Sequence, residues 1–174
     1  MLPEPTHRLR FREMTDDDLD QLTTTLAAWD QGGPRREPRT RADAARWIAW
    51  TRNNYTEHGH GLWVIETHEG RFVGDCGLTI QDVEGEDLVE VGWHVHPELR
   101  LQGYATEAAA AVRAAARSTG VTDHLIAIIR PDNLPSQRVA QKIGLRLERR
   151  VWKLGGDALV FGADLEPELS PRDA

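Results

Sequence analysis

Residues 100–106, Arg-Leu-Gln-Gly-Tyr-Ala-Thr, combine residue types that could bind a phosphate group. They lie between an expected strand and an expected alanine-rich helix, in which eight of residues 105–116 are alanine. Backbone N–H groups in the first turn of a helix have no partner within the helix, and with the helix dipole they attract anions. Gly103 lets a phosphate approach the backbone, Ala105 keeps the first turn small, and Arg100 adds positive charge. The alternative is an ordinary strand-to-helix turn that contains a glycine.

A second pair of polar residues, Asn133 and Ser136, lies three positions apart, where a buried strand is expected to end and a short helix to begin. Open α/β sheets bind ligands at the carboxyl ends of their strands, so an amide and a hydroxyl at this place could contact one. The structural alternative is that Asn133 is a turn residue and that Ser136 is the N-cap of the helix. Both interpretations stay open on residue types alone.

Taken together, these segments resemble the GCN5-related N-acetyltransferase (GNAT) superfamily, most nearly its branch of ribosomal-protein N-terminal (RimJ/RimL-like) acetyltransferases. Three motifs follow in the order of that family: the pyrophosphate loop Arg/Gln-x-x-Gly-x-Gly/Ala at Arg100, Gly103 and Ala105, the preceding acidic-hydrophobic-Gly-aromatic strand at residues 90–95, and the Asn-x-x-Ser and Lys-hydrophobic-Gly motifs at Asn133, Ser136 and residues 142–144. Because three spaced motifs are far more specific than one, the chain is identified as a member of the superfamily.

The resemblance implies acetyl-CoA as the donor and a primary amine as the acceptor. It also implies that Val95 pairs backbone groups with the pantetheine arm where two parallel strands splay apart, that residues 101–106 wrap the pyrophosphate, and that Asn133 contacts the arm or a bound water. The donor-binding residues implied in this way are Val95, His96, Arg100, Leu101, Gln102, Gly103, Tyr104, Ala105, Thr106, Asn133 and Ser136.

The reaction requires a base, because a protonated amine cannot attack a thioester. By its position in the strand Glu90 resembles the usual acid of the family, and it is the candidate base, acting through water. A partly buried carboxylate at this place could have a raised pKa. The alternative is a solvent-facing glutamate beside the acidic turn at residues 82–87. Asp75, on the adjacent expected strand, is the reserve base or the counter-ion of the acceptor amine.

The departing thiolate requires a proton. Many relatives place a tyrosine seven residues beyond the asparagine, and that position is Ala140 in this sequence. In the resembled branch a serine is proposed instead, which gives this role to Ser136. Because an alkyl thiol is acidic enough to leave near neutral pH with modest help, the alternative is that Ser136 only donates a hydrogen bond to the sulfur.

Aromatic and imidazole side chains supply the candidates for the acceptor site. In this family the two early helices overhang that site, so one of Trp29, Trp47 and Trp50 is expected to contact the acceptor, with Trp29 as the chosen candidate; the alternative is helix packing. His94 is expected to line the acceptor pocket and His96 to lie near the donor. These two histidines share a strand face, but no third ligand stands at a recognised spacing, so no metal is expected.

Hydrophobic periodicity predicts the elements that position these residues. We expect strands near residues 9–11, 62–65, 72–80, 88–95, 125–129, 145–153 and 158–163, and helices near residues 15–29, 41–55, 104–118 and 136–143. In the second helix, Ala45, Ile48 and Ala49 are expected to face the core, and Trp63 and Trp93 are expected to be core residues of strands. This order predicts an α/β fold with a mixed, mostly antiparallel, twisted sheet that is splayed at the donor site and has helices on both faces. One domain is expected over residues 1–174, with an ordered core of about 8–165 and a polar C-terminal tail.

Composition limits the partners. The formal charge of -7 argues against nucleic acid, since phosphate-backbone binding requires clustered basic charge. The single cysteine, Cys76, excludes a disulfide framework or a cysteine-based zinc site and is expected to be a packed side chain. The sequence contains no apolar run of about 18 residues, the length that a membrane-spanning helix needs. Its first residues also lack a signal peptide, so no membrane partner and a cytoplasmic location are expected.

Two functions remain in view. The first is direct acetyl transfer from acetyl-CoA to a protein N-terminus or a small amine; the second is a non-catalytic acyl-CoA-binding or sensor domain with the same fold. The presence of Glu90 and Ser136 favours the enzyme. The acidic residues around Asp75, Glu90 and the turn at 82–87 could attract a cationic amine or could simply be a solvated face. Family resemblance also makes a homodimer a reasonable expectation.

Overall fold

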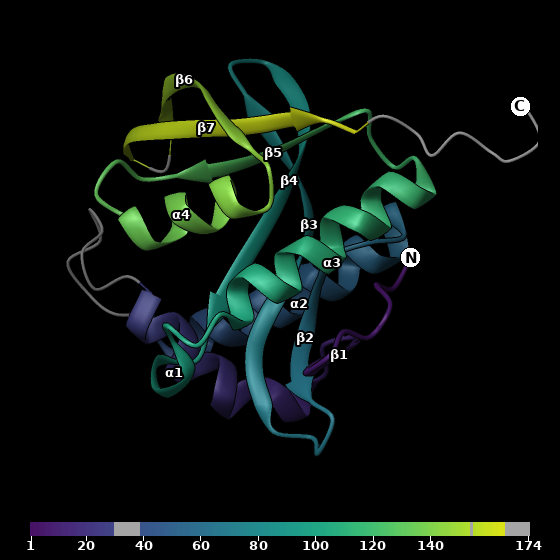
Figure 1. Ribbon diagram of the computed structural model, residues 1–174. Helices are drawn as coiled ribbons and strands as arrows, with labels where there is room; N and C mark the ends of the chain where they lie inside the picture. Colours follow the sequence, from purple (N-terminus) through teal and green to yellow (C-terminus); the bar gives the residue numbers. More distant parts are fainter. Residues whose placement is uncertain (30–38, 154, 166–174) are drawn as a thin grey trace, which may run out of the picture.

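Figure 1 shows the computed structural model of the chain, which describes residues 1–29, 39–153 and 155–165. Its strands are β1 (Leu9–Arg12), β2 (Leu62–Thr67), β3 (Phe72–Val83), β4 (Glu86–Val95), β5 (His124–Ile129), β6 (Arg146–Lys153) and β7 (Gly156–Asp164). Its α-helices are α1 (Leu19–Trp29), α2 (Arg41–His58), α3 (Tyr104–Thr119) and α4 (Leu134–Lys142), and the 3-10 turns η1 (Asp16–Asp18) and η2 (Pro97–Leu99) precede α1 and α3. This order of elements agrees with the prediction from the sequence.

Within the described residues, seven strands form one mixed sheet in the order β1-β2-β3-β4-β5-β7-β6. The pair β4–β5 is parallel, and the other neighbouring pairs are antiparallel. A parallel pair requires a long crossover between its strands, and here α3 supplies it. The predicted fold class, a mixed and mostly antiparallel sheet, is therefore confirmed.

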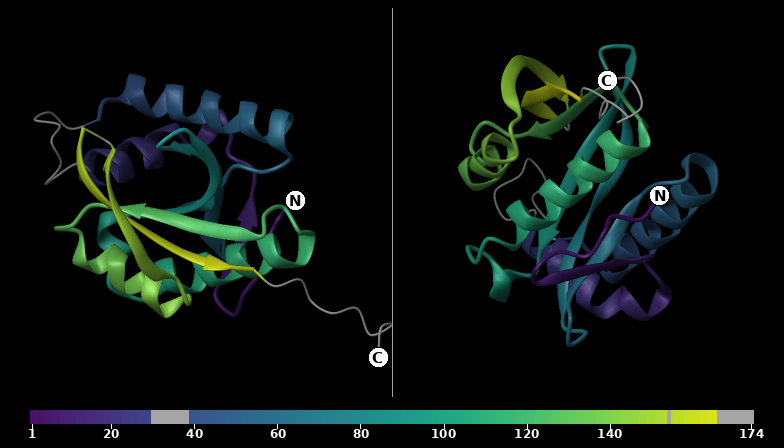
Figure 2. Two further views of the ribbon diagram at one scale, coloured as in Figure 1. Left: turned by 90° about the horizontal axis from the view of Figure 1, so that it is seen from above. Right: turned by 45° about the vertical axis from the view of Figure 1, so that its right-hand side comes forward.

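Helices cover both faces of this sheet (Figure 2). The cluster on one face contains buried alanines and aliphatic residues of α3 and α4 packed on the central strands, with Trp63 fully buried and Trp93 packed against it. The cluster on the other face joins α1 and α2 to Val64 of β2. The alanine-rich sequence of α3 lets this helix lie close to the sheet, because Ala108, Ala109 and Ala116 are completely buried.

The predicted inward face of α2 is corrected by the structure. Ile48 is buried as expected, but Ala45 and Ala49 are exposed, and Ala44 is buried in their place. The residues that face the core follow the 3.6-residue period from Ala44 through Ile48 to Thr51. Four alanines occur within residues 42–49, so their pattern alone allowed a rotation of the helix by one position.

The start of α4 is also corrected. The helix begins at Leu134 rather than Ser136, and Asn133 is its N-cap, because the Asn133 side-chain oxygen accepts a hydrogen bond from the backbone N–H of Ser136 at 3.2 Å. Pro135 is compatible with this start, because a proline in the first turn loses no helical hydrogen bond. Ser136 is therefore not the cap. The predicted tail after Leu165 and most of the loop between α1 and α2 lie outside the described residues.

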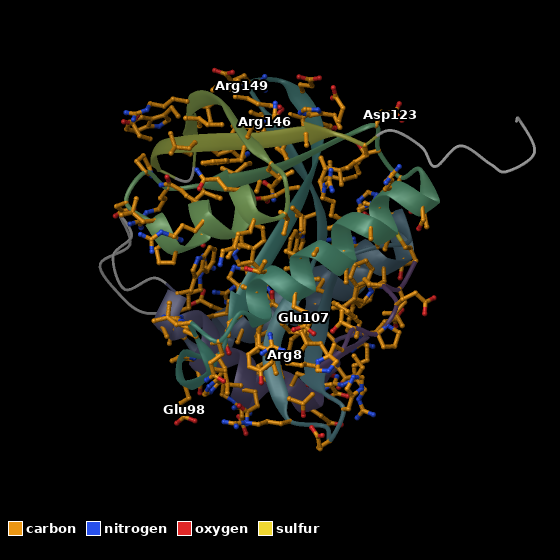
Figure 3. The ribbon with its side chains drawn as sticks, in the orientation of Figure 1. Arg8, Glu98, Glu107, Asp123, Arg146 and Arg149 are labelled. Carbon is orange, nitrogen blue, oxygen red and sulfur yellow. The ribbon has the colours of Figure 1, made fainter. Side chains whose placement is uncertain are left out.

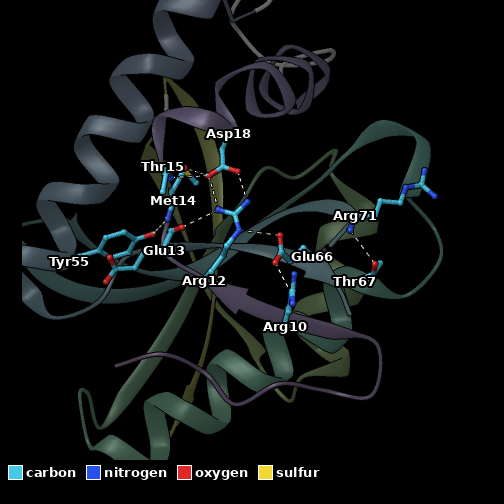
Figure 4. Close-up of polar contacts among 10 residues, drawn as sticks. All are labelled: Arg10, Arg12, Glu13, Met14, Thr15, Asp18, Tyr55, Glu66, Thr67 and Arg71. Carbon is cyan, nitrogen blue, oxygen red and sulfur yellow. Dashed lines mark hydrogen bonds and ion pairs between the residues drawn. The ribbon is translucent and has the colours of Figure 1, made fainter. Parts of the chain in front are cut away.

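A network of charged side chains joins β1, β2 and the start of α1 (Figure 4). Arg12 donates from both terminal nitrogens to the Asp18 carboxylate, at 2.9 and 2.6 Å, and from Nε to Glu66 at 3.1 Å. The other Glu66 oxygen accepts from Arg10 at 2.7 Å, and the backbone N–H of Thr15 donates to Asp18 at 2.8 Å. Burial acts to raise the pKa of Asp18, but the hydrogen bonds from Arg12 and Thr15 outweigh it and hold that pKa below its usual value. We refer to Arg10, Arg12, Asp18 and Glu66 as the arginine network.

Candidate active site

The central feature of the candidate site is an opening in the sheet between β4 and β5. In the part of the chain that the structure describes, these strands pair only at Val89↔Leu125 and Glu90↔Ile126, although β4 continues to Val95 and β5 to Ile129. Figure 1 shows the two strands diverging, with the start of α3 beyond the end of β4 and the start of α4 beyond the end of β5. The predicted splay is thus present, and beyond these two pairs the facing edges of β4 and β5 are not paired with each other.

Glu90 lies where the two strands separate. Its Oε1 accepts a hydrogen bond from the backbone N–H of Ile128 at 3.0 Å, and its Oε2 accepts one from the Thr79 hydroxyl at 3.4 Å. The Glu90 side chain thereby binds a backbone amide of β5 two residues beyond the last paired position. It takes the place of a hydrogen bond from the backbone of β4, which no longer pairs with β5 there. Burial raises the pKa of Glu90, although the hydrogen bond from Ile128 opposes that effect. The sequence did not indicate this contact, since it depends on how two strands diverge.

Beyond the end of β4, residues 101–106 form the expected loop and first helical turn. Leu101 and Gly103 both have left-handed backbone conformations, with φ of 62° and 86°. A non-glycine residue in this region stores strain of about 1–3 kcal/mol, which is found most often at functional sites. Gly103 is the N-cap of α3, and the first helical hydrogen bond runs from the N–H of Glu107 to its carbonyl at 3.1 Å. The N–H groups of residues 104–106 precede that bond and are directed out of the helix end, as an anion site requires.

Arg8, the residue directly before β1, contacts this loop, a role that the sequence did not indicate. Its Nη1 donates to the carbonyl of Gln102 at 3.0 Å, and its guanidinium lies over the Tyr104 ring at 4.4 Å. It also pairs with Glu107 in the first turn of α3 at 2.6 Å, and Figure 3 shows the two side chains together at the start of that helix. Burial alone would raise the pKa of Glu107, but the hydrogen bonds from Thr6 and Arg8 hold it below its usual value. The loop is therefore held by contacts from the segment that precedes β1.

The turn between β4 and the loop holds Val95, His96 and Arg100. The N–H of His96 donates to the Val73 carbonyl at 2.8 Å, and the His96 carbonyl accepts from the N–H of Leu99 at 2.9 Å. His96 is therefore the N-cap of η2. Arg100 is exposed, and its Nε donates to the Val95 carbonyl at 3.2 Å. These residues lie where β4 leads into the anion-binding turn. Their contacts with a donor stay predictions.

Beyond the end of β5, Asn133 and Ser136 lie at the start of α4. The Asn133 carbonyl oxygen caps the helix, and the half-buried Ser136 hydroxyl has no hydrogen-bond partner among the described residues. Ala140 is fully buried one turn later, so no hydroxyl replaces the tyrosine that many relatives carry there. Ser136 is thus a free hydroxyl in the first turn of a helix beside the opening of the sheet.

On the face covered by α1 and α2, Asp75 and His94 form a pair across β3 and β4. Their backbones are directly paired, and the Nδ1 of His94 lies 2.7 Å from Oδ1 of Asp75. The Asp75 side chain is fully buried and that of His94 is 9% exposed. Trp29 and Trp47 pack edge-to-face on the His94 ring, with centroid distances of 4.4 and 5.4 Å. Trp29, Asp75 and His94, the candidates for acceptor contact, are therefore brought together, and Trp47 joins them.

Arg39 contacts the aromatic side chains of this face, whereas Cys76 lies on the opposite face of the sheet. The guanidinium of Arg39 lies over the rings of Trp29 and Trp47, at 4.6 and 5.5 Å. Cys76 is fully buried in the core cluster of α3, and burial raises the pKa of its thiol well above the usual value, so it is the packed side chain that was expected.

In residues 1–29, 39–153 and 155–165, no group of three or more His, Cys, Asp or Glu side chains is placed to hold a metal ion. None of the described helices is both long and apolar enough to span a membrane.

Comparison with known proteins gives a consistent result. Residues 8–146 match the family model for the acetyltransferase (GNAT) domain. The uncharacterized protein YkkB of Bacillus subtilis (strain 168) is 30% identical over 162 residues, which cover 90% of this chain and 92% of that protein. The crystal structure of an acetyltransferase from Agrobacterium tumefaciens str. C58 superposes with a TM-score of 0.78 at 26% identity, covering 94% of each chain.

Two solved structures with bound coenzyme share the same fold. One is RimL, a ribosomal L7/L12 α-N-protein acetyltransferase in complex with coenzyme A, with a TM-score of 0.77, 14% identity, and coverage of 95% of this chain and 98% of that chain. The other is yncA from Salmonella typhimurium with its cofactor acetyl-CoA, with a TM-score of 0.70, 19% identity, and coverage of 95% and 99%.

Proposed function

The chain belongs to the acetyltransferase (GNAT) family, and from that premise we propose that it moves an acetyl group from acetyl-CoA directly to a primary amine. The observation that carries the proposal is the opening between β4 and β5. Two strand edges there are not paired with each other beyond Glu90 and Ile126, and the two strands lead toward the starts of α3 and α4. Peptide-like groups of a pantetheine arm can hydrogen bond to such edges, and a helix N-terminus can bind the phosphates.

We assign donor binding to the turn and loop that follow β4 and to Asn133. The loop suits a diphosphate, because Gly103 has no side chain to obstruct it and the N–H groups of residues 104–106 are free of helical partners. Arg100 adds positive charge at the rim, and backbone groups near Val95 and His96 contact the arm. When bound, acetyl-CoA supplies the activated acetyl group.

We assign to Ser136 the hydrogen bond or proton that the departing thiolate requires. Its hydroxyl lies in the first turn of α4, where the helix dipole stabilises negative charge. Replacement by alanine is expected to lower turnover more than donor affinity. Equal losses in turnover and affinity would instead indicate that Ser136 only binds the donor.

The acceptor is proposed to be a protein N-terminus or another small primary amine. The amine must lose a proton before it attacks, and two groups on the α1–α2 face can receive it: Glu90, the candidate from the sequence, and the pair Asp75–His94. The name of the structural neighbour RimL, an α-N-protein acetyltransferase, supports a protein N-terminus as one acceptor to test. The homodimer and the cytoplasmic location stay predictions of the sequence.

The proposed function is tested by calorimetric titration with acetyl-CoA and by thiol release in the presence of an amine panel: short peptides with free N-termini, a polyamine and an aminoglycoside. We expect donor binding and thiol release with at least one amine. Donor binding without thiol release for every amine would contradict the enzyme and favour the acyl-CoA-binding domain.

A matched pair of variants tests the anion-binding loop. Gly103→Glu is expected to weaken acetyl-CoA binding by about 100-fold or more, because placing like charges together costs several kcal/mol. Gly120→Glu is the control, since Gly120 caps the opposite end of α3 in the same left-handed conformation, with open space around it. Equal affinities for the two variants would overturn the assignment of the loop.

A further inference from the structure

His94 is held in a single orientation by its hydrogen bond to Asp75. The Nδ1–Oδ1 distance is 2.7 Å, and the buried carboxylate can only accept, so Nδ1 carries the hydrogen. In a neutral imidazole the other ring nitrogen, Nε2, then has its lone pair available for a proton. An imidazole oriented by a carboxylate in this way is a recurring arrangement for general bases.

The surroundings of the ring restrict it further. Trp29 from α1 and Trp47 from α2 pack against the imidazole and keep it from rotating away from Asp75, while 9% of the side chain stays exposed. Three charged groups lie near the ring: Asp75 on β3, Glu90 on β4 with His94 itself, and Arg39, which lies over the two indoles. The ring is therefore fixed, partly accessible and hydrogen-bonded to one of the two carboxylates.

Asp75 itself is incompletely paired. Its Oδ1 is bonded to His94, whereas its buried Oδ2 has no hydrogen-bond partner in the described part of the chain. A buried carboxylate oxygen without a partner costs folding free energy, so its presence calls for a functional explanation. Holding an imidazole ready to become positively charged is such an explanation.

Glu90 is less available than His94. Both of its oxygens accept hydrogen bonds from the protein, from Ile128 and Thr79. Gly92 lies between Glu90 and His94 along β4, and a side chain added there would contact Leu62. Glu90 maintains the opening of the sheet, and His94 faces the aromatic side chains of the acceptor region.

We propose that Nε2 of His94 receives the proton of the acceptor amine, with Asp75 as the positioning residue that orients the ring and stabilises its charged form. The proposal rests on the proposed acetyl transfer. In the reaction, the ammonium gives one proton to Nε2, the free nitrogen forms a bond to the acetyl carbon, and the carbon–sulfur bond breaks. As the amide forms, the nitrogen loses its second proton to solvent. The thiolate takes a proton from solvent, either directly or through Ser136, which solvent then reprotonates, and the imidazolium returns its proton to solvent.

The test is the pH dependence of kcat, which reports groups in the bound complex, measured by thiol release with the fastest amine of the panel. Wild-type kcat is expected to fall at acid pH as one group becomes protonated. His94→Gln should lower kcat by about 10²–10⁴-fold and abolish that acid limb, because proton transfer by a positioned side chain contributes about that factor. Acetyl-CoA affinity, measured by calorimetry, should change less than twofold in the same variant.

Two further variants separate catalysis from structure. Asp75→Asn should lower kcat by about tenfold or more while acetyl-CoA affinity stays unchanged, since the imidazole loses the carboxylate that orients it. His94→Ala should regain at least tenfold in kcat on addition of free imidazole, which a purely structural loss would not allow.

Glu90→Gln is the matched comparison, and it should retain the acid limb. Loss of the limb in Glu90→Gln and its retention in His94→Gln would overturn the proposal and make Glu90 the base. An unchanged kcat in Asp75→Asn would likewise contradict it. Wild-type protein that binds acetyl-CoA but releases no thiol with any amine would instead overturn the proposed function itself.

Discussion

Two buried carboxylates on the same side of the sheet, Glu66 and Asp75, have opposite surroundings. Glu66 on β2 has each of its oxygens bonded to an arginine, and its partner Arg12 is bonded to both oxygens of Asp18. Asp75 on β3 has one oxygen bonded to His94 and the other without a partner in the described residues. Both carboxylates of the arginine network thus have each oxygen hydrogen-bonded, whereas Asp75 has only one.

This difference separates structural from chemical use of a charged group. A buried charge whose hydrogen bonds are all satisfied rigidifies its surroundings, and removal of one partner is costly because the others stay buried. A partly paired carboxylate beside an imidazole stabilises the fold less, but it can respond to a proton. We therefore expect changes in the arginine network to alter stability, and changes at Asp75 or His94 to alter turnover.

The largest expected effect on stability comes from Arg12→Ala. This change leaves Asp18 and Glu66, 5% and 9% exposed, without their shared partner. The free energy of unfolding should fall by about 2–3 kcal/mol, since uncompensated buried charges are costly. Arg10→Ala is the control: its side chain is 48% exposed and contacts only Glu66 within the network, so a loss of about 1 kcal/mol or less is expected. Urea unfolding measures both, and equal losses would refute the distinction.

The second prediction concerns acid pH. Because the pKa of Asp18 is lower in the folded chain than in the unfolded chain, its stabilising contribution is complete above the unfolded value and is lost as pH falls through the folded value. Asp18→Asn should therefore be less stable than wild type at pH 7, with a difference that shrinks as the pH is lowered from about 4 toward 2. Urea midpoints over that range provide the measurement. A difference independent of pH would show that the charge of Asp18 does not contribute.

A smaller and opposite effect is expected at Glu90. Its pKa is raised in the fold, so below its unfolded value both states are protonated, and stability is lost as the pH rises and the unfolded state ionises first. Glu90→Gln keeps an oxygen for the Ile128 N–H but cannot ionise. The variant should be at least as stable as wild type at pH 7, and the difference should grow between about pH 4 and 7. A lower urea midpoint at pH 7 would mean that the ionised carboxylate holds the opening of the sheet.

Much of the fold followed from local sequence patterns, whereas the contacts of the site did not. Strand alternation, helix periodicity and the glycine at the end of α3 are local signals, and they gave nearly all the elements within a few residues. The pairing of Arg8 with Glu107, or of Arg12 with Glu66, joins segments far apart in the chain, so no local pattern reports it.

The contacts of the Asp75–His94 pair were still harder to predict from the sequence. The sequence placed Asp75 and His94 on adjacent strands and chose Trp29 as a neighbour, yet the hydrogen bond between the first two depends on strand register. The contact of Trp47 with His94 depends on the rotation of α2, which alanine spacing predicted incorrectly by one position. Register and rotation are set by packing between elements, and a single sequence constrains both only weakly.

The most direct test of the account compares Glu66→Gln with Asp75→Asn, two changes that each replace one carboxylate oxygen by an amide nitrogen. For each variant we would measure the free energy of unfolding and kcat for thiol release per folded enzyme. We expect Glu66→Gln to lose about 1–3 kcal/mol of stability and to keep its kcat, because a buried charged contact is broken. We expect Asp75→Asn to keep its stability and to lose kcat by about tenfold or more, because the imidazole loses the carboxylate that stabilises its charged form. A stable Glu66→Gln with reduced kcat, or an unstable Asp75→Asn with wild-type kcat, would contradict it.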